Sequence, residues 1–265
     1  MIIKNTTIFI ILIILLLIYC FFIEPNMLTI THYKINDKDL SGIRIVFVGD
    51  FHIKPNQEKR LKKVINTINK QNPDIVLSVG DFVSGHQENM TMPIEDIAKQ
   101  LKNIKSKYGF YTVLGNHDWW QDGEHIKEIL SKSGIIVLEN SNKNIQINNK
   151  NIYISGVDDM MTRETDITSA LTNTKNPTIL LSHNPDIFPY IPQEVNLTLA
   201  GHTHGGQVRF PIIGAPIVPS YYGDLYSQGL IIENNKKMIV TKGIGNSILS
   251  IRFNCIPEIV VIEFN

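Results

Sequence analysis

The chain has 265 residues, with 25 Lys and Arg against 25 Asp and Glu, and 43% of its residues are hydrophobic. This length suits one large domain or two small ones with ample core. A net charge of zero, with 19% charged residues, argues against a disordered chain and against a protein that grips nucleic acid through Lys and Arg. The two cysteines, Cys20 and Cys255, are too few for a disulfide framework.

An unbroken apolar segment runs from Ile8 to Ile23, and the uncharged stretch reaches back to Asn5. As a helix, about 19 residues span about 28 Å, close to the thickness of a bilayer core. No small-residue cleavage pattern follows, so the segment favours an uncleaved anchor over a signal peptide. We expect residues 1–25 to be a single-pass anchor in the inner (cytoplasmic) cell membrane and 26–42 to be a tether or edge strand. The lysines on both sides leave open which face of the membrane carries the remaining chain.

Residues 43–265 alternate short apolar runs with amphipathic stretches and contain no internal repeat. Helical spacing of apolar residues appears in 58–71 and again from Ile94 to Ile104, with Pro93 near the start of the second helix. This alternation predicts βαβ units in the first half, and the strand-rich second half suggests two packed sheets flanked by helices. The predicted strands are 43–48, 75–79, 110–114, 151–157, 178–182, 197–200, 237–241 and 259–264.

Residues whose side chains can bind a metal ion follow five of these predicted strands. Because ligands of open α/β sheets collect beyond the carboxyl ends of the strands, we expect these side chains to meet. Carboxylate, amide and imidazole ligands suit Mn²⁺, Fe²⁺ or Zn²⁺, and the set lacks the thiolates of structural zinc sites. Each short motif alone is as consistent with an ordinary turn, but their joint occurrence at strand ends favours a metal site. The candidate positions are Asp50, His52, Asp81, Asn116, His117, Asp118, His183, His202 and His204, whereas His32, His86 and His125 lie outside the pattern.

The series Asp50-x-His52, Gly80-Asp81, Gly115-Asn116-His117-Asp118, His183 and Gly201-His202-x-His204 resembles the calcineurin-like metallophosphoesterase superfamily. The block 200–207 and the closing segments 242–245 and 252–258 resemble its membrane-associated bacterial phosphodiesterase branch, some members of which hydrolyse UDP-2,3-diacylglucosamine in lipid A synthesis. The resemblance implies an α/β protein with a four-layer αββα sandwich, here behind an N-terminal transmembrane helix, and a site for two divalent ions, with Mn²⁺ favoured over Fe²⁺ or Zn²⁺.

Position by position, the resemblance assigns Asp50, His52 and His204 to one ion, Asn116, His183 and His202 to the other, and Asp81 to both. It implies hydrolysis of a phosphodiester or pyrophosphate bond by a hydroxide that bridges the two ions. His117 has no ligand role in this scheme and is expected to protonate the leaving oxygen as general acid. Asp118 either orients that imidazole or only caps a helix.

Substrate preference must come from features outside the ligand set. The apolar, proline-broken stretch 210–222 either lines a lipid-binding groove, dips into a membrane interface or packs on the sheet. Trp119 and Trp120 either contact substrate or belong to the core, and Arg163 is a candidate phosphate clamp.

Three functions stay open at this point. The expected partners are a phosphate-containing substrate and a membrane, and no nucleic acid is expected. The leading one acts on a lipid-linked or nucleotide-linked phosphodiester or pyrophosphate, most sharply UDP-2,3-diacylglucosamine. The second is a broad phosphodiesterase or phosphatase acting on cell-wall or soluble phosphates. The third is a non-catalytic scaffold, which the complete ligand set disfavours. The oligomeric state is left open.

Overall fold

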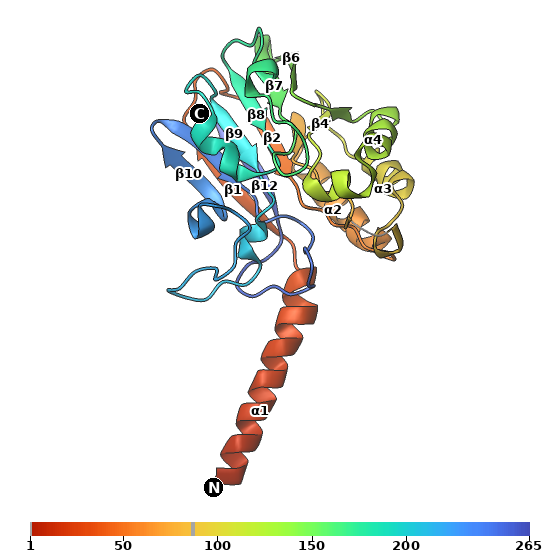
Figure 1. Ribbon diagram of the computed structural model, residues 1–265, viewed down its shortest axis with the longest axis vertical. Coiled ribbons are helices and arrows are strands. Elements are labelled where there is room, and N and C mark those ends of the chain that lie inside the picture. The colour runs from red at the N-terminus through yellow and green to blue at the C-terminus, as the bar shows by residue number, and fades with distance from the viewer. Residues whose placement is uncertain (1, 86–87) are drawn as a thin grey trace.

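The computed structural model describes residues 2–85 and 88–265, in which an apolar helix projects from an α/β domain (Figure 1). Helix α1 (Ile2–Ile18) continues through a π-helical turn, η1 (Tyr19–Ile23), into the short 3₁₀ helix η2 (Glu24–Asn26). Within the 21 residues from Thr6 to Asn26, an 18-residue window has a mean hydropathy of 3.0, and only 6% of that window is buried. By length and composition this segment is a candidate membrane span, and its exposure distinguishes it from a core helix.

Six strands form the first sheet, in the order β1, β12, β2, β3, β4 and β5. Strand β12 runs parallel to β1 and antiparallel to β2, whereas β2, β3, β4 and β5 are mutually parallel. The edge strand β1 therefore joins the start of the domain to its last strand. The bounds are β1 Thr29–Ile35, β12 Glu258–Phe264, β2 Arg44–Val48, β3 Ile75–Ser78, β4 Phe110–Thr112 and β5 Ile136–Val137.

Six further strands form the second sheet, in the order β10, β11, β9, β8, β7 and β6. The two outer pairs are antiparallel hairpins, and the strands between them are parallel. The central strands β8 and β9 are buried on both faces, as strands covered on both sides must be. The bounds are β10 Gly229–Glu233, β11 Lys236–Val240, β9 Leu197–Ala200, β8 Thr178–Leu181, β7 Lys150–Gly156 and β6 Ser141–Ile147.

The two sheets pack face to face around an aliphatic core. Ile45 and Phe47 of β2 meet Ile179 and Leu181 of β8 in this layer, and full burial of each such side chain stabilises the fold by about 1.5–3 kcal/mol. The alternate residues Val46 and Val48 face the opposite way, onto the helices. Strand alternation thus sorts one strand's side chains between two cores.

Helices cover the outer face of each sheet, which completes four layers (Figure 1). The αββα arrangement implied by the family resemblance is therefore confirmed. Over the second sheet the cover is thin, because α5 has one turn and the rest is 3₁₀ helix. The helices over the first sheet are α2 Glu58–Lys70, α3 Ile94–Leu101 and α4 Asn116–Lys132; those over the second are α5 Ile167–Ala170 and η4 Pro185–Tyr190. Shorter 3₁₀ turns are η3 Glu88–Met90, η5 His204–Gly206 and η6 Gly223–Tyr226.

The predicted strands begin and end within two residues of those observed. The second predicted helix ends at Leu101, and Ile104 packs against the core from the turn beyond. Helix α4 runs to Lys132, where the sequence indicated only a start at Asp118. Its apolar spacing is broken by a kink at Asp122, whose φ of −171° is not helical.

Candidate metal centre

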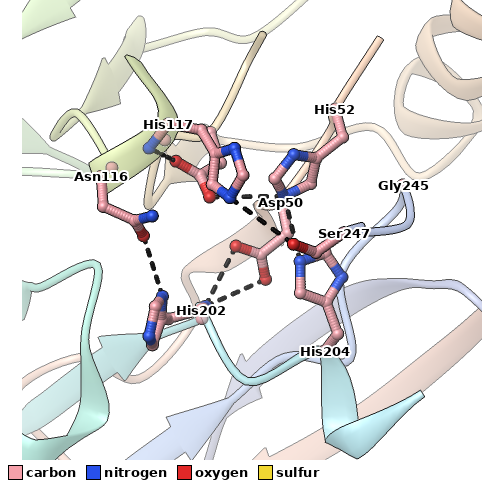
Figure 2. Close-up of polar contacts among 12 residues, drawn as sticks. Asp50, His52, Asn116, His117, His202, His204, Gly245 and Ser247 are labelled. Carbon is pink, nitrogen blue, oxygen red and sulfur yellow. Dashed lines mark hydrogen bonds and ion pairs between the residues drawn. The ribbon is translucent and has the colours of Figure 1, made fainter. Parts of the chain in front are cut away.

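The loops after β2, β3, β4, β8 and β9 meet at one edge of the two-sheet sandwich. They bring all the sequence-predicted ligands into a single buried cluster, and the imidazoles converge on the carboxylates (Figure 2). None of these side chains is more than 9% exposed. Burial of so many polar groups is costly unless each finds a partner or binds an ion. The candidate ligands are Asp50, His52, Asp81, Asn116, His183, His202 and His204.

The backbone of this edge is held in a conformation that most residues avoid. Asp50, His52, Asp81, His202 and His204 have φ values of 51°, 41°, 53°, 69° and 51°, all in the left-handed region. Such residues cost about 1–3 kcal/mol each and persist only where the surroundings impose them. The sharp reversal after each strand turns the side chain back toward the cluster.

A close approach between loops explains why a glycine precedes Asn116. A Cβ atom on Gly115 would lie 2.2 Å from Asp81 Oδ1 and 2.6 Å from the ring of His183. These distances are far inside van der Waals contact, so a side chain here would push two candidate ligands apart. The Gly-Asn-His-Asp motif therefore begins with glycine for a steric reason.

One half of the cluster contains His52, His204, Asp50 and Asp81. The Nε2 atoms of His52 and His204 lie 3.0 Å apart, and Asp81 Oδ2 is 3.3 Å from His52 Nε2. Asp50, His52 and His204 each offer a donor atom within 4.8 Å of the others. The backbone N–H of His202 donates to both carboxylate oxygens of Asp50, at 3.0 and 3.1 Å, which fixes that carboxylate.

The other half contains Asn116, His183 and His202. Asn116 Oδ1 is 2.9 Å from His183 Nε2 and 2.9 Å from His202 Nδ1, and the two ring nitrogens are 3.2 Å apart. Three donor atoms thus form a nearly equilateral triangle. Asp81 Oδ2 lies 3.4 Å from His183 Nε2, so the same oxygen faces both halves of the cluster.

These spacings fit ligands of divalent ions. With metal–nitrogen bonds of about 2.1 Å, ligands at 90–109° lie about 3.0–3.4 Å apart. His183 Nδ1 is 2.7 Å from the carbonyl of Val79, which can only accept, so Nδ1 carries a proton and Nε2 is the ring atom that would bind an ion. Burial alone would lower the pKa of His183, but Asp81 and Asp50 outweigh burial and raise it to about 10, so an ion that binds here displaces the Nε2 proton. Burial lowers the pKa of His202 to about 3 and that of His204 well below its ordinary value, so both imidazoles are neutral, as ligands must be. The residues present fit a metal centre.

The charge of Asp81 is also suited to this place. Burial alone would raise its pKa, but His183 and His52 outweigh burial and lower the pKa of Asp81 well below its ordinary value. Asp81 is therefore an ionised carboxylate between the two halves of the cluster. A negative charge at the middle of the cluster is what two neighbouring cations require.

His117 lies at the edge of the ligand cluster. Its backbone N–H donates to Asp81 Oδ1 at 2.9 Å, and its Nδ1 is 2.7 Å from the carbonyl of Ser84, which leaves Nε2 facing the cluster. Trp120 packs edge-on against the ring, with centroids 4.9 Å apart, and is 40% exposed. His117 also forms a third donor set with His52 and Asp81, which is the arrangement of a ligand. Burial lowers its pKa to about 4.

Asp118 contacts backbone rather than the His117 imidazole. Its carboxylate accepts from the N–H groups of Asp81 at 2.7 Å, Phe82 at 2.8 Å, Val83 at 3.3 Å and Gly115 at 3.1 Å. Of the two roles considered from sequence, these contacts favour the cap, here extended to the loop that carries Asp81. The carboxylate joins the ends of β3 and β4, the two strands that supply Asp81 and Asn116.

Two residues of the site were missed by sequence reasoning. Ser247 Oγ lies 3.5 Å from His117 Nε2, and the N–H of Gly245 donates to the carbonyl of Asp50 at 2.6 Å (Figure 2). Both come from the loop before β12, which carries no ligand motif. The signal available was the Gly-x-Gly spacing at 243–245. His86 lies outside the described residues.

Arg252 is fully buried directly behind this loop. Its guanidinium donates to the carbonyls of Lys242 at 2.8 Å, Gly245 at 2.6 Å and Cys255 at 2.9 Å, and to Asn246 Oδ1 at 3.0 Å. The five fixed N–H groups of arginine suit such a set of carbonyls. Arg252 therefore holds the loop that contacts the backbone of Asp50.

The other singled-out residues lie beside the cluster. Arg163 stacks on the ring of Trp119, with its guanidinium carbon 4.5 Å from the ring centroid, and approaches Glu124 at 4.0 Å. Trp119 packs partly into the core under the helices, whereas its neighbour Trp120 packs against the ring of His117. The two tryptophans thus divide between core and site.

A two-sheet fold with buried imidazole and carboxylate ligands at the strand ends defines the class of metal-dependent hydrolases. Residues 43–206 match the family model described as calcineurin-like phosphoesterase, and the chain belongs to this family. It is a metal-dependent phosphoester hydrolase.

Relatives support this membership along the chain. The uncharacterized metallophosphoesterase YkuE of Bacillus subtilis is 30% identical over 92% of this chain and 87% of its own length. Phosphodiesterase YaeI of Escherichia coli is 27% identical over 92% of this chain and 91% of its own length. A transmembrane protein with a metallophosphoesterase domain from Danio rerio is 30% identical over 78% of this chain and 50% of its own length. The solved structure of a 5′-nucleotidase precursor from Thermus thermophilus supports the fold alone. It has a TM-score of 0.51 and 15% identity, and the match covers 77% of this chain and 49% of that chain.

Proposed function

We propose that this chain is a membrane-anchored phosphoesterase with two divalent ions, Mn²⁺ foremost, that cleaves a phosphodiester or pyrophosphate bond in a lipid-linked substrate. The observation that carries the two-ion proposal is the position of Asp81 Oδ2, 3.3 Å from His52 Nε2 and 3.4 Å from His183 Nε2. Asp50, His52 and His204 would hold one ion with Asp81, and Asn116, His183 and His202 would hold the other.

When bound, the ions supply an activated water and neutralise charge on the phosphoryl oxygens. The chain's own contribution is the placement of the candidate ligands and of a proton donor, His117, beside them. His117 Nδ1 is tied to the carbonyl of Ser84, so Nε2 carries a proton only when the ring is cationic. Ser84 and Asp81 already favour that cation against the effect of burial, and a bound phosphate adds negative charge that raises the pKa of His117 further.

In the proposed hydrolysis the attacking water releases one proton to solvent and its oxygen bonds to phosphorus, while the electron pair of the broken phosphorus–oxygen bond remains on the leaving oxygen. His117 Nε2 donates its proton to that oxygen, and the imidazole regains a proton from solvent. Ser247 Oγ, 3.5 Å from Nε2, is placed to orient the imidazole or the leaving group.

The sharpest form of the substrate proposal is UDP-2,3-diacylglucosamine, cleaved at its pyrophosphate for lipid A synthesis in the inner membrane. The anchor candidate, residues 6–26, and the exposed Trp120 beside His117 support an amphiphilic substrate held at a membrane. The second candidate is a broad-specificity phosphodiesterase. Its relative YaeI is named as a phosphodiesterase, which favours that alternative.

The test is an assay of the full chain in vesicles with Mn²⁺, on UDP-2,3-diacylglucosamine, bis-p-nitrophenyl phosphate and p-nitrophenyl phosphate. We expect the nucleotide lipid to have the highest kcat/KM. Equal or higher values on the aryl esters would favour the broad phosphodiesterase. Protease protection of the domain in spheroplasts decides the leaflet, because a lipid A intermediate is cleaved on the cytoplasmic face.

His117→Ala separates the two roles that the geometry allows for this residue. As general acid its loss lowers kcat by about 10²–10⁴ on substrates with poor leaving groups. The effect is much smaller with p-nitrophenolate, which leaves without a proton. We expect the variant to keep two ions per chain by elemental analysis. Loss of an ion would instead make His117 a ligand, as its grouping with His52 and Asp81 permits.

A further inference from the structure

Two loops beside the candidate metal centre expose large apolar side chains to solvent. Ile212, Tyr221 and Ile248 are 107%, 93% and 92% exposed, values of side chains that touch almost nothing. Contiguous exposed apolar surface marks a site of interaction. We call this set the apolar rim: Phe210, Ile212, Ile213, Ile217 and Tyr221 from the first loop, and Ile248 and Leu249 from the second.

Backbone conformation holds two of these side chains outward. Ile212 and Ile248 have φ values of 74° and 58°, in the left-handed region that β-branched residues avoid. The strain is of the order of 1–3 kcal/mol at each position. Two strained isoleucines at the tips of two exposed loops are what a surface built for an apolar partner presents.

The two loops form one continuous surface. The N–H of Arg209 donates to the carbonyl of Phe253 and the N–H of Phe253 donates to the carbonyl of Gln207, both at 2.9 Å. The rings of Phe210 and Phe253 pack with centroids 5.9 Å apart. Gln207 Nε2 also donates to the carbonyl of Ser247 at 3.1 Å. Direct contacts therefore join the two loops that carry the apolar rim.

This surface is fastened to the end of the apolar N-terminal helix. The N–H of Arg252 donates to the carbonyl of Cys20 at 3.0 Å. The carboxylate of Glu24, itself fully buried, accepts from the N–H groups of Asn254 at 3.0 Å and Cys255 at 2.5 Å. Figure 1 shows the loops of the rim on the side of the domain from which α1 departs. The rim thus lies level with the end of the candidate span.

We propose that the apolar rim inserts into the interfacial layer of the phospholipid bilayer that α1 crosses. This inference rests on the proposed membrane anchoring of the chain. Isoleucine, phenylalanine and tyrosine side chains suit the boundary between headgroups and acyl chains. The helix holds the domain at the bilayer and the rim sets its tilt, because a second contact point removes rotation about the helix end.

The consequence for the reaction is the direction from which substrate arrives. Ser247, whose Oγ lies 3.5 Å from His117 Nε2, directly precedes Ile248 of the rim. Insertion of the rim therefore brings the mouth of the metal centre to the headgroup layer. The substrate class that fits is a phosphoester in the headgroup of a lipid that stays in the bilayer during cleavage.

The experiment labels single introduced cysteines with an environment-sensitive fluorophore in the full chain, reconstituted in phosphatidylcholine–phosphatidylglycerol vesicles. The native Cys20 and Cys255 are buried, and the unsubstituted chain measures their background labelling. The rim sites are Ile212→Cys and Ile248→Cys. The matched control is Ile232→Cys, 62% exposed and paired with Lys237 at the end of β10 remote from the metal centre.

If the rim inserts, both rim labels shift their emission to the blue and are quenched by spin-labelled lipid but not by iodide, whereas the control label behaves in the opposite way. Rim labels quenched by iodide alone, in a chain that resists carbonate extraction from the vesicles, overturn the inference while leaving the anchor intact. A chain that carbonate extracts overturns the proposed anchoring and, with it, this inference.

Activity gives a second, independent reading. Ile212→Asp places a charge in the rim outside the metal centre, and Ile232→Asp is its control. We expect Ile212→Asp to lower kcat/KM on a lipid-embedded phosphoester by about tenfold, since a carboxylate resists burial in the interface, and to leave hydrolysis of soluble bis-p-nitrophenyl phosphate unchanged. Equal activity of both variants on the lipid substrate contradicts the inference.

Discussion

Asp118 offers the sharpest test of how this site is built. Its carboxylate accepts four backbone N–H groups, from Asp81, Phe82, Val83 and Gly115, and is 0% exposed. Asp118→Ala removes every one of these acceptors at once. If Asp118 is a positioning residue for the Asp81 loop, the variant loses stability and metal together; if it only orients His117, the variant loses turnover alone.

The magnitude follows from the four donors. A buried donor left unpaired costs about 1–3 kcal/mol, and water entering the space left by the carboxylate repairs part of the loss, so we take the lower figure and expect about 4 kcal/mol. That is a large part of the roughly 5–15 kcal/mol that separates folded from unfolded domains. At about 2–4 °C per kcal/mol for a chain of this size, Tm falls by about 8–16 °C.

The assay is thermal unfolding of the full chain in detergent, together with metal content after dialysis. Asp166→Ala is the matched control, because Asp166 caps the short helix α5 through one N–H bond, from Ser169 at 2.9 Å, and lies away from the ligands. Its loss costs about 1 kcal/mol. A Tm for Asp118→Ala equal to that of Asp166→Ala, with two ions retained and kcat lost, would refute the positioning role.

Three further predictions concern charge. Asp81→Asn removes the carboxylate facing both halves of the cluster, and we expect elemental analysis to find fewer than two ions per chain; full retention contradicts the bridging role. Glu24→Ala leaves the N–H groups of Asn254 and Cys255 without their acceptor and lowers the free energy of unfolding by about 2–4 kcal/mol, whereas an unchanged Tm means that the helix end is not fastened there. Burial, with Glu139 nearby, raises the pKa of Asp158 from 3.8 to about 6. The folded chain therefore binds the proton of the Asp158 carboxyl more tightly than the unfolded chain does. The stabilisation that this proton provides is lost as the pH rises through about 6. The Asp158→Asn variant lacks this effect. Relative to the unsubstituted chain, we expect its free energy of unfolding to be about 1 kcal/mol higher at pH 8 than at pH 4, after allowance for solvent screening. Equal pH profiles of stability for the two chains would count against this prediction.

The strands and the convergence of the candidate ligands could be predicted because their signals are local. Each ligand follows its own strand within a few residues, as Asp50 follows β2 and His202 follows β9. Burial on both faces makes these strands continuous apolar runs, which periodicity detects. The convergence of the ligands then follows from parallel strands ending at one edge.

The remainder depends on contacts between distant parts of the chain. Strand β6 (Ser141–Ile147) is polar and Asn-rich, and it becomes a strand by pairing with β7 rather than by propensity. Glu24 meets Cys255, and Ser247 meets His117, across 231 and 130 residues. Local patterns carry no information about such pairs. Only the structure could therefore show the contact between the end of the N-terminal helical segment and Cys255, and the contact between Ser247 and His117.

The left-handed backbone of the ligands limits how this site can change over evolution. At Asp50, His52, Asp81, His202 and His204, with φ between 41° and 69°, the backbone disfavours valine, isoleucine and threonine before any chemistry is considered. The tolerated replacements are glycine, asparagine, aspartate and histidine, and three of these four can bind a metal. Single substitutions that suit this backbone thus tend to exchange one metal-binding side chain for another, so the choice of side chain at these positions is narrowed by conformation as well as by chemistry.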